Sequence, residues 1–248
     1  MRSIGKTVVA AAMAATLLLL GALAFVRAPQ GRDGGTTSST TPSSGALLIP
    51  VAGSGSLEAT IASLQQRLRT IPEDARGYAS LGLAYVAQGR VTADPTWYPK
   101  AESALAESIR LKGPDNVEAA LGLGALALAR HDFEAALAQG RLAAELNPYG
   151  PGAYGVIGDA LLELGRYDEA FDAFQTMVDT RPDLSSFARV SYARELLGEV
   201  DGAVQAMEQA FETAAMAADA AWAAYQLGEL AWGVGDVRTA ATWYERGL

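Results

Sequence analysis

Cysteine is absent from this chain of 248 residues. Its absence excludes a disulfide framework, a cysteine-based metal site and a thiol nucleophile, and it also excludes a lipid anchor attached through cysteine. Segments with the alternating polarity of strands are scarce. Alanine-rich windows dominated by strong helix formers are frequent. The composition therefore predicts a helical protein.

Histidine is nearly absent as well, because His131 is the only one. It lies in the segment 129–133, which we expect to be a turn between two helices, and no nucleophile elbow or spaced partner supports a Ser-His-Asp triad. The run from Gly122 to Gly124 lacks the preceding strand and the third glycine of a phosphate-binding loop. We therefore predict no catalytic, cofactor-binding or metal site and no enzyme. Catalysis would need a segment beyond Leu248.

Acidic residues outnumber basic ones, with 28 Asp and Glu against 19 Lys and Arg and a net charge of −9. The first 56 residues hold four basic residues and one acid, so the remainder carries 27 acids, 15 bases and a net charge of −12. Such a surface repels nucleic-acid phosphates and anionic lipids, which disfavours both as partners. Most of these carboxylates are interpreted as residues on solvent-exposed helix faces.

The sequence repeats with a period of 34 residues. This step separates Pro148 from Pro182, Gly124 from Gly158, Phe133 from Tyr167, and Ala136 from Ala170. A repeat of this length is a helix–turn–helix unit that cannot bury its apolar face alone and therefore stacks on copies of itself. A helix bundle, the alternative, needs no fixed period between its turns. The period predicts an all-α solenoid.

Five units fit this period, each with a small residue in its first helix and an alanine in its second. The small residues are Gly82, Gly124, Gly158, Ser191 and Gly228. The second helices are expected to open with Tyr98, Phe133, Tyr167, Val200 and Val237. Because antiparallel helices approach closely only where side-chain bulk is missing, we expect the small residues to be helix crossings.

This pattern resembles the tetratricopeptide repeat family over roughly residues 57–248. The family pattern of an aromatic residue, Leu-Gly and Tyr is seen in the first unit as Tyr78, Leu81-Gly82 and Tyr85. The resemblance implies a solenoid whose first helices line the inner surface, and a protein that acts as a binding scaffold. It places this chain among bacterial exported or membrane-anchored repeat proteins.

The repeat domain is expected to span residues 57–248. A stripe of leucine and isoleucine from Leu57 to Leu68 ends before Pro72, which predicts a lone helix at 57–72 that caps the first unit. The five repeats are expected at about 75–114, 117–150, 151–183, 184–216 and 221–248.

Two departures from the period predict local differences. The segment from Val91 to Trp97 lengthens the turn of the first unit, either as a contact loop on one edge of the solenoid or as a tolerated insertion. The fourth unit has no proline after its second helix, which is therefore expected to run on through Ala214 to Ala218. A longer helix or a looser joint is expected there.

An uncharged apolar stretch from Thr7 to Val26 follows Arg2 and Lys6. It is long enough to span a bilayer, so residues 1–27 are predicted to be a signal-anchor helix. A small-x-small motif at 22–24 leaves open a cleaved signal peptide. Either interpretation places the repeats outside the cytoplasm, anchored in the cell membrane by this helix only or secreted.

Residues 28–56 are rich in Gly, Ser, Thr and Pro and are predicted to form a flexible tether. Only the segment from Ala46 to Val51 is apolar. This short segment either docks on the solenoid or is an apolar part of the linker.

The inner side of the solenoid is the predicted partner surface. Its positions are mostly Leu, Ala and Gly in the first two units and become polar or aromatic later. The candidate groove residues are Asp159, Glu163, Arg189, Tyr192, Glu195, Trp222, Tyr225, Glu229 and Trp232. Aromatic rings beside carboxylates suit a peptide that carries Lys or Arg. The alternative for each is packing between units or simple solvation.

Two hypotheses for the function follow. The leading one is a membrane-tethered, extracytoplasmic adaptor that holds an extended peptide or a partner helix in its concave groove. Family members that grip a C-terminal carboxylate use Lys and Asn on first helices, and neither occupies the inward positions here, which disfavours that mode. In the alternative, Trp222, Tyr225, Trp232 and Trp243 form a pocket for a cationic or sugar-like small molecule. Neither hypothesis requires a cofactor.

Overall fold

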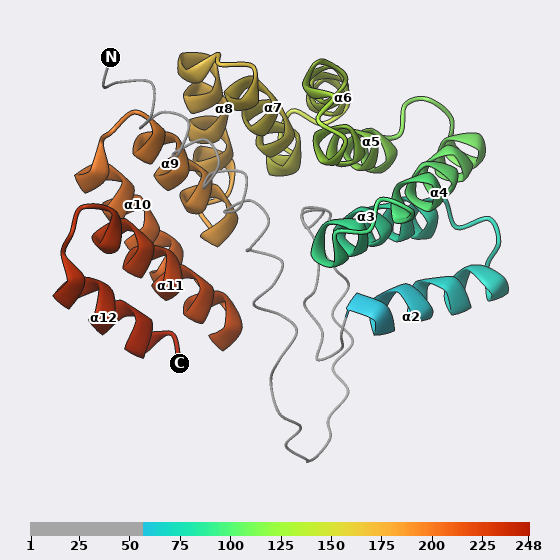
Figure 1. The fold of residues 1–248 in the computed structure, drawn as a ribbon. Helices are drawn as coiled ribbons and strands as arrows, with labels where there is room; N and C mark the ends of the chain where they lie inside the picture. The colour runs from blue at the N-terminus through green and yellow to red at the C-terminus, as the bar shows by residue number, and fades with distance from the viewer. Residues whose placement is uncertain (1–56) are drawn as a thin grey trace.

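The computed structural model describes residues 57–248, which contain eleven α-helices and no strand. The helices are α2 (Leu57–Thr70), α3 (Ala75–Thr92), α4 (Trp97–Lys112), α5 (Val117–Ala129), α6 (Phe133–Leu146), α7 (Pro151–Glu163), α8 (Tyr167–Thr180), α9 (Leu184–Leu196), α10 (Val200–Glu212), α11 (Ala217–Gly233) and α12 (Val237–Arg246). They form a single helix followed by five helix–turn–helix units (Figure 1). The helical fold predicted by the period is confirmed for these residues.

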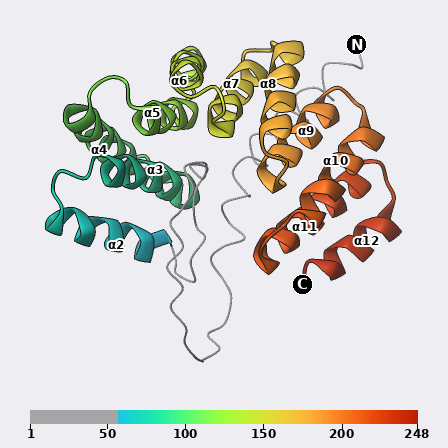
Figure 2. The ribbon, with the colours of Figure 1, turned by 180° about the vertical axis from the view of Figure 1, so that it is seen from behind.

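The helices follow an arc from α2 to α12 (Figure 1). The two helices of each unit pack on each other, and the second helix of one unit packs on the first helix of the next. The first helices, α3, α5, α7, α9 and α11, also contact one another in order, and they lie towards the inside of the arc in both views (Figure 2). Each unit is thus supported by its neighbours, as in an α-solenoid.

Aspartate side chains define several helix starts. Asp74, Asp132 and Asp236 each accept a hydrogen bond from the backbone N–H three residues later. Such a cap satisfies a donor that has no partner within the helix. Four second helices begin at their predicted first residue, and α4 begins one residue earlier, at Trp97.

Small residues lie where the helices of one unit cross. A Cβ atom added to Gly82, Gly158 or Gly228 would collide with Leu105, Phe174 or Tyr244, respectively, on the second helix of the same unit. In unit four, the hydroxyl of Ser191 donates a 2.8 Å hydrogen bond to the carbonyl of Ala203. Gly124 differs, because a Cβ there would collide with Val156 of α7. This glycine therefore serves the contact between units two and three.

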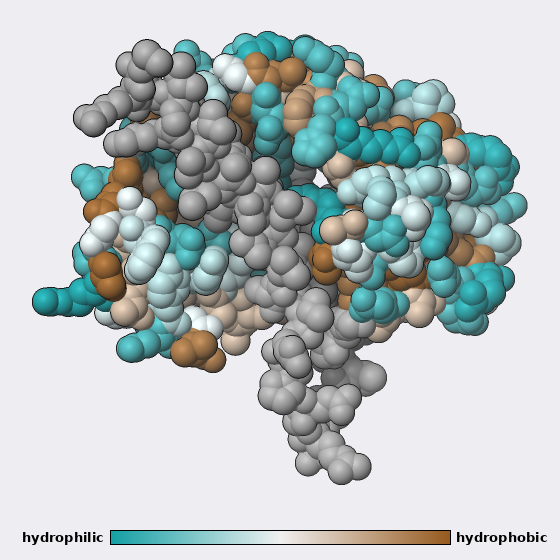
Figure 3. All heavy atoms as spheres, viewed as in Figure 1, coloured by the Kyte–Doolittle hydropathy of each residue, from teal (hydrophilic) through white to brown (hydrophobic). Residues whose placement is uncertain are grey.

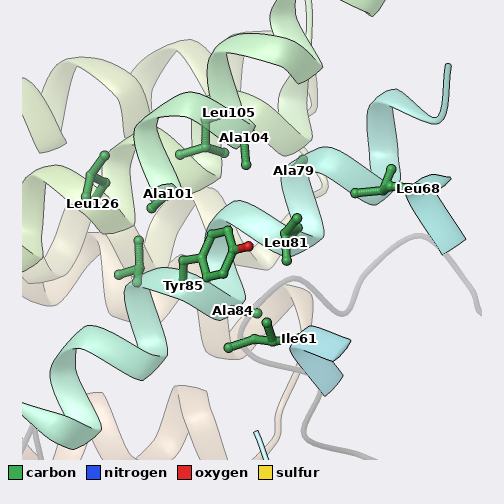
Figure 4. Close-up of a cluster of buried hydrophobic side chains, with 11 residues drawn as sticks. Ile61, Leu68, Ala79, Leu81, Ala84, Tyr85, Ala101, Ala104, Leu105 and Leu126 are labelled. Carbon is green, nitrogen blue, oxygen red and sulfur yellow. The ribbon is translucent and has the colours of Figure 1, made fainter. Parts of the chain in front are cut away.

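The first hydrophobic core joins α2 to the first two units. Ile61 and Leu68 of α2 belong to the same buried cluster as Leu81 of α3 and Leu105 of α4 (Figure 4). By covering α3, helix α2 shields the end of the array from water. The structure agrees with the predicted capping helix, which ends at Thr70 rather than at residue 72.

The lengthened segment of the first unit mostly extends helices. Helix α3 continues to Thr92 and α4 starts at Trp97, which leaves residues 93–96 as the turn. Ala93 adopts a φ of 52°, and a side-chain oxygen of Asp94 accepts a hydrogen bond from the backbone N–H of Thr96. The insertion is therefore accommodated by longer helices rather than by a long loop.

The joint after the fourth unit does not contain the continuous helix that was expected through Ala214–Ala218. Helix α10 ends at Glu212, where the Thr213 hydroxyl donates a 2.7 Å hydrogen bond to the carbonyl of Gln209. Met216 is extended, with φ −129° and ψ 148°, and α11 begins at the next residue. The fifth unit therefore starts at Ala217, before the expected residue 221.

The predicted signal-anchor helix at 1–27 and the tether at 28–56 lie outside the described residues. Among residues 57–248, no helix is both long and apolar enough to cross a bilayer. The membrane expectation therefore depends on the sequence of the first 27 residues.

Glu118 connects the ends of three helices. Its mostly buried carboxylate, in the first turn of α5, accepts hydrogen bonds from Arg76 of α3 at 3.0 Å and from Lys112 of α4 at 2.7 Å. Burial acts to raise the pKa of Glu118, but the hydrogen bonds and charges of Lys112 and Arg76 outweigh it. The pKa consequently lies below its ordinary value.

We expect Glu118→Gln to lower the free energy of unfolding by about 2 kcal/mol near neutral pH, because two charge-assisted hydrogen bonds to partly exposed cations are lost. Since the pKa is lower in the folded chain than in the unfolded chain, this contribution is complete above the unfolded pKa and lost as the pH falls through the folded one. Urea unfolding of both proteins at a series of pH values should therefore converge in acid. A stability difference that is independent of pH would contradict the assigned role.

Candidate functional site

One register position follows the inner side of the array. It lies directly after the crossing residue and holds Leu83 and Ala125 in the first two units, then Asp159, Tyr192 and Glu229. The last three side chains are only partly buried. The inner side therefore becomes polar towards the C-terminal units. Elsewhere, in the view of Figure 3, hydrophilic residues cover much of the coloured surface and hydrophobic ones form scattered patches.

Asp159 and Arg189 form a two-point ion pair between α7 and α9. Nε and Nη2 of Arg189 each lie 2.9 Å from a different carboxylate oxygen of Asp159. The side chains are only 17% and 11% exposed for Arg189 and Asp159, respectively, and Nη1 of Arg189 also donates to the Ser185 hydroxyl at 2.6 Å. The pair therefore joins units three and four, and both carboxylate oxygens of Asp159 are occupied.

Arg90, at the end of α3, adds a positive charge that the sequence did not point to. Burial lowers the pKa of its guanidinium, the Asp159 carboxylate acts to raise it, and Arg189 acts to lower it further. Arg90 of unit one is thus within electrostatic range of units three and four. This proximity results from the curvature of the arc, which no local sequence signal describes.

Three carboxylates near this pair have no cationic partner. Glu163 of α7, Glu195 of α9 and Glu229 of α11 take part in none of the ion pairs found among residues 57–248. Loss of hydration raises the pKa of Glu163, and His131 partly offsets this rise. Loss of hydration also raises the pKa of Glu195, to which the neighbouring Glu229 charge adds. The charge of Glu229 therefore acts on Glu195 across the contact between α9 and α11.

Tyr192 lies between these carboxylates and the second hydrophobic core, the buried cluster around Phe174 and Val190. Its partly buried ring packs against that core. Burial raises the pKa of its hydroxyl, and the charges of Glu163 and Glu195 raise it further. Its ring therefore has the packing role that the sequence left open, while its hydroxyl is near the carboxylates.

Glu229 is oriented by Tyr244 from the second helix of the same unit. Tyr244 Oη donates a 2.6 Å hydrogen bond to Glu229 Oε1. The Tyr244 ring lies 5.7 Å, between centroids, from the ring of Tyr225. Sequence reasoning missed Tyr244 because it considered first helices only. Its register position in the second helix could have identified it, because the same position holds the core residues Phe174 and Met207 in the two preceding units.

The four aromatic residues near the C-terminus do not form one ring cluster. Trp243, on α12, contacts Phe211 edge-to-face at 5.5 Å, and the guanidinium of Arg246 lies 4.3 Å from its ring centroid. Trp222 packs at the edge of the third core, which is centred on Leu227. These two indole rings are therefore held by packing contacts of the last two units.

The other two aromatic residues are exposed. Tyr225 is 41% exposed and Trp232 is 60% exposed. They share one stripe of α11 with Glu229, because the spacings of four and three residues return to the same side of a helix. Of the four rings, only these two are available to a ligand beside a carboxylate.

His131 lies in the turn between α5 and α6, as expected. It has a φ of 59°, is exposed, and its ring contacts Phe133 edge-on at 5.6 Å. In the part of the chain that the structure describes, no three His, Asp or Glu side chains gather as a metal site. Towards the C-terminal units, the inner side carries charged and aromatic side chains.

Comparisons with known proteins agree with the repeat pattern. The profile of the tetratricopeptide repeat matches residues 98–151 and 151–185. A search of curated proteins found no match. Among solved structures, TTC0263, a thermophilic tetratricopeptide repeat protein of Thermus thermophilus, is similar with 21% identity and a TM-score of 0.60 over 70% of this chain and 90% of that one.

Two further structures share the fold. A chain of the APC/C hetero-tetramer Cut9–Hcn1 is similar over 79% of this chain and 37% of that one, with 16% identity and a TM-score of 0.64. PilF of Pseudomonas aeruginosa is similar over 75% of this chain and 81% of that one, with 17% identity and a TM-score of 0.52. The repeat profile, the 34-residue period and the helical arc agree, and residues 98–185 of the chain are tetratricopeptide repeats.

Proposed function

We propose that this protein is a non-enzymatic adaptor that holds an extended peptide or a helix of a partner protein against the inner side of α7, α9 and α11. Tetratricopeptide repeat proteins generally mediate protein–protein interactions, and the inner surface of a solenoid is a common binding surface. One similar structure, the Cut9–Hcn1 hetero-tetramer, is itself a complex of two different proteins.

The observation that supports this surface most strongly is the exposure of Tyr225 and Trp232 beside Glu229. Exposed aromatic side chains leave a large apolar area in contact with water, and a partner can bury that area. Such side chains are frequent in binding hot spots. The small-molecule alternative has less support, because the packing of Trp222 and Trp243 removes two of the four rings from the pocket it requires.

The proposal also places the adaptor at the outer side of the cytoplasmic membrane. Its support is the apolar stretch from Thr7 to Val26 preceded by two basic residues. The tether at 28–56 would then give the repeats freedom to reach a partner near the membrane.

The test is a crosslinking pull-down from membranes with the full chain and with Trp232→Ala. We expect a specific partner to be recovered with the unchanged chain and its recovery to fall about tenfold with the variant, as for loss of a hot-spot ring. Tyr149→Ala is the matched control, because Tyr149 is an exposed aromatic residue in the loop between α6 and α7. Equal recovery with Trp232→Ala and Tyr149→Ala would refute binding at the inner side.

A further inference from the structure

We propose that Glu195, Glu229, Tyr225 and Trp232 form a site for an arginine or lysine side chain of the bound peptide. This inference rests on the proposed function and specifies the chemistry of the partner at one position. It concerns the inner side of α9 and α11, which contact each other.

The Asp159–Arg189 pair shows how the chain itself supplies a cation to a carboxylate at the register position of Glu229. Asp159 directly follows the crossing residue Gly158, and its cation comes from Arg189, on the first helix of the next unit. Glu229 directly follows Gly228 in the same register. Glu229 takes part in none of the ion pairs found among residues 57–248. A cation from a partner would occupy the corresponding place.

The two carboxylates are suited to a shared cation. Glu195 and Glu229 lie on the contacting helices α9 and α11, and neither takes part in an ion pair among residues 57–248. Tyr244 donates a hydrogen bond to one oxygen of Glu229, the Tyr225 hydroxyl also interacts with this carboxylate, and a carboxylate has further lone pairs that can accept a donor. A guanidinium between the carboxylates would relieve their repulsion and form charge-assisted hydrogen bonds.

The exposed rings add the second element of recognition. Tyr225 precedes Glu229 by four residues and Trp232 follows it by three, so one ring lies on either side of the carboxylate along α11. Aromatic faces attract cations and also cover the methylene stem of a long side chain. The net charge of −12 beyond residue 56 would draw a basic segment towards this surface.

The test uses a fluorescein-labelled dodecapeptide of alternating alanine and arginine, and the same peptide with citrulline in place of every arginine. Citrulline retains the length and planarity of arginine without its charge. Binding to the full chain is measured by fluorescence anisotropy at about 0.15 M salt, which screens distant charges. We expect the citrulline peptide to bind at least about tenfold more weakly, as for loss of a charge-assisted contact.

Two double variants separate the site from the overall charge. Glu195→Gln with Glu229→Gln should weaken binding of the arginine peptide about tenfold, since glutamine keeps the acceptor for Tyr244 but removes the charge. Glu208→Gln with Glu245→Gln removes the same charge from exposed positions of α10 and α12, on the second helices of these units, and should change binding less than about twofold. Circular dichroism of both variants checks that the helices remain folded.

Equal binding of the two peptides, or equal losses in the two double variants, would overturn the cation site. If Trp232→Ala still releases the partner in the pull-down in that case, the adaptor function stands and only its basic specificity fails. If Trp232→Ala leaves partner capture unchanged, the proposed function itself fails.

Discussion

Phe174→Ala is expected to lower the free energy of unfolding by about 4 kcal/mol. The Phe174 ring is 1% exposed in the second core and lies directly against Gly158 of α7. Because Gly158 has no side chain, it cannot fill the space that the ring leaves. Urea unfolding followed by circular dichroism measures the loss. A change below about 1 kcal/mol would show that the units repack freely around the cavity.

Tyr167→Ala provides the matched control on the same helix. Tyr167 is 46% exposed, so the loss of its ring should cost less than about 1 kcal/mol. A paired variant tests the fit itself. A methyl group on Gly158 collides with Phe174, and a smaller leucine at that position relieves part of the collision, so Gly158→Ala combined with Phe174→Leu should cost less than the two single changes added together.

Arg189→Ala is expected to destabilise the fold by about 3 kcal/mol, because it leaves the Asp159 carboxylate mostly buried without its cation. The same unfolding measurement applies. A loss below about 1 kcal/mol would contradict the structural role assigned to the pair.

Asp159→Leu combined with Arg189→Met distinguishes a structural pair from a binding residue. Replacing both partners by apolar groups of similar size removes the buried charge and its compensation together, so stability should return to within about 1 kcal/mol of the unchanged chain. Binding of the arginine peptide should also persist, since Glu195 and Glu229 remain. If the double variant folds but binds no peptide, Asp159 or Arg189 contacts the partner directly.

The periodic features of the fold were predictable from the sequence. The 34-residue step places Gly158 and Gly228 at helix crossings, because close approach of two helices requires a missing side chain, and this is visible in the sequence. The starts at Phe133 and Val237 follow from the same register and from the aspartate cap before each. The helix expected through Ala214–Ala218 was wrong, because the absence of a proline after the second helix does not by itself extend that helix, and α10 ends at Glu212.

The candidate site was predictable only as a set of positions. Sequence reasoning placed Asp159 and Arg189 on the inner side but did not pair them, since pairing depends on the offset between adjacent units. It grouped Trp243 with Trp232. The ring of Trp243, on α12, packs against Phe211, whereas the ring of Trp232, on α11, is exposed. It omitted Tyr244, whose hydroxyl reaches the inner side from a core position of the second helix.

The joint between the last two units has a consequence for how a partner would be held. Helix α12 packs on α11, and α11 packs on α10 with a smaller contact to α9. In a repeat array a unit such as the fifth can open while its neighbours stay folded, because it is held only by its interfaces with the adjacent units. Glu229 and Trp232 belong to that unit, whereas Glu195 belongs to the one before it. A ligand that bridges Glu195 and Glu229 would therefore join the fifth unit to the fourth, so its affinity and the protection of α11 amides from hydrogen exchange would rise together.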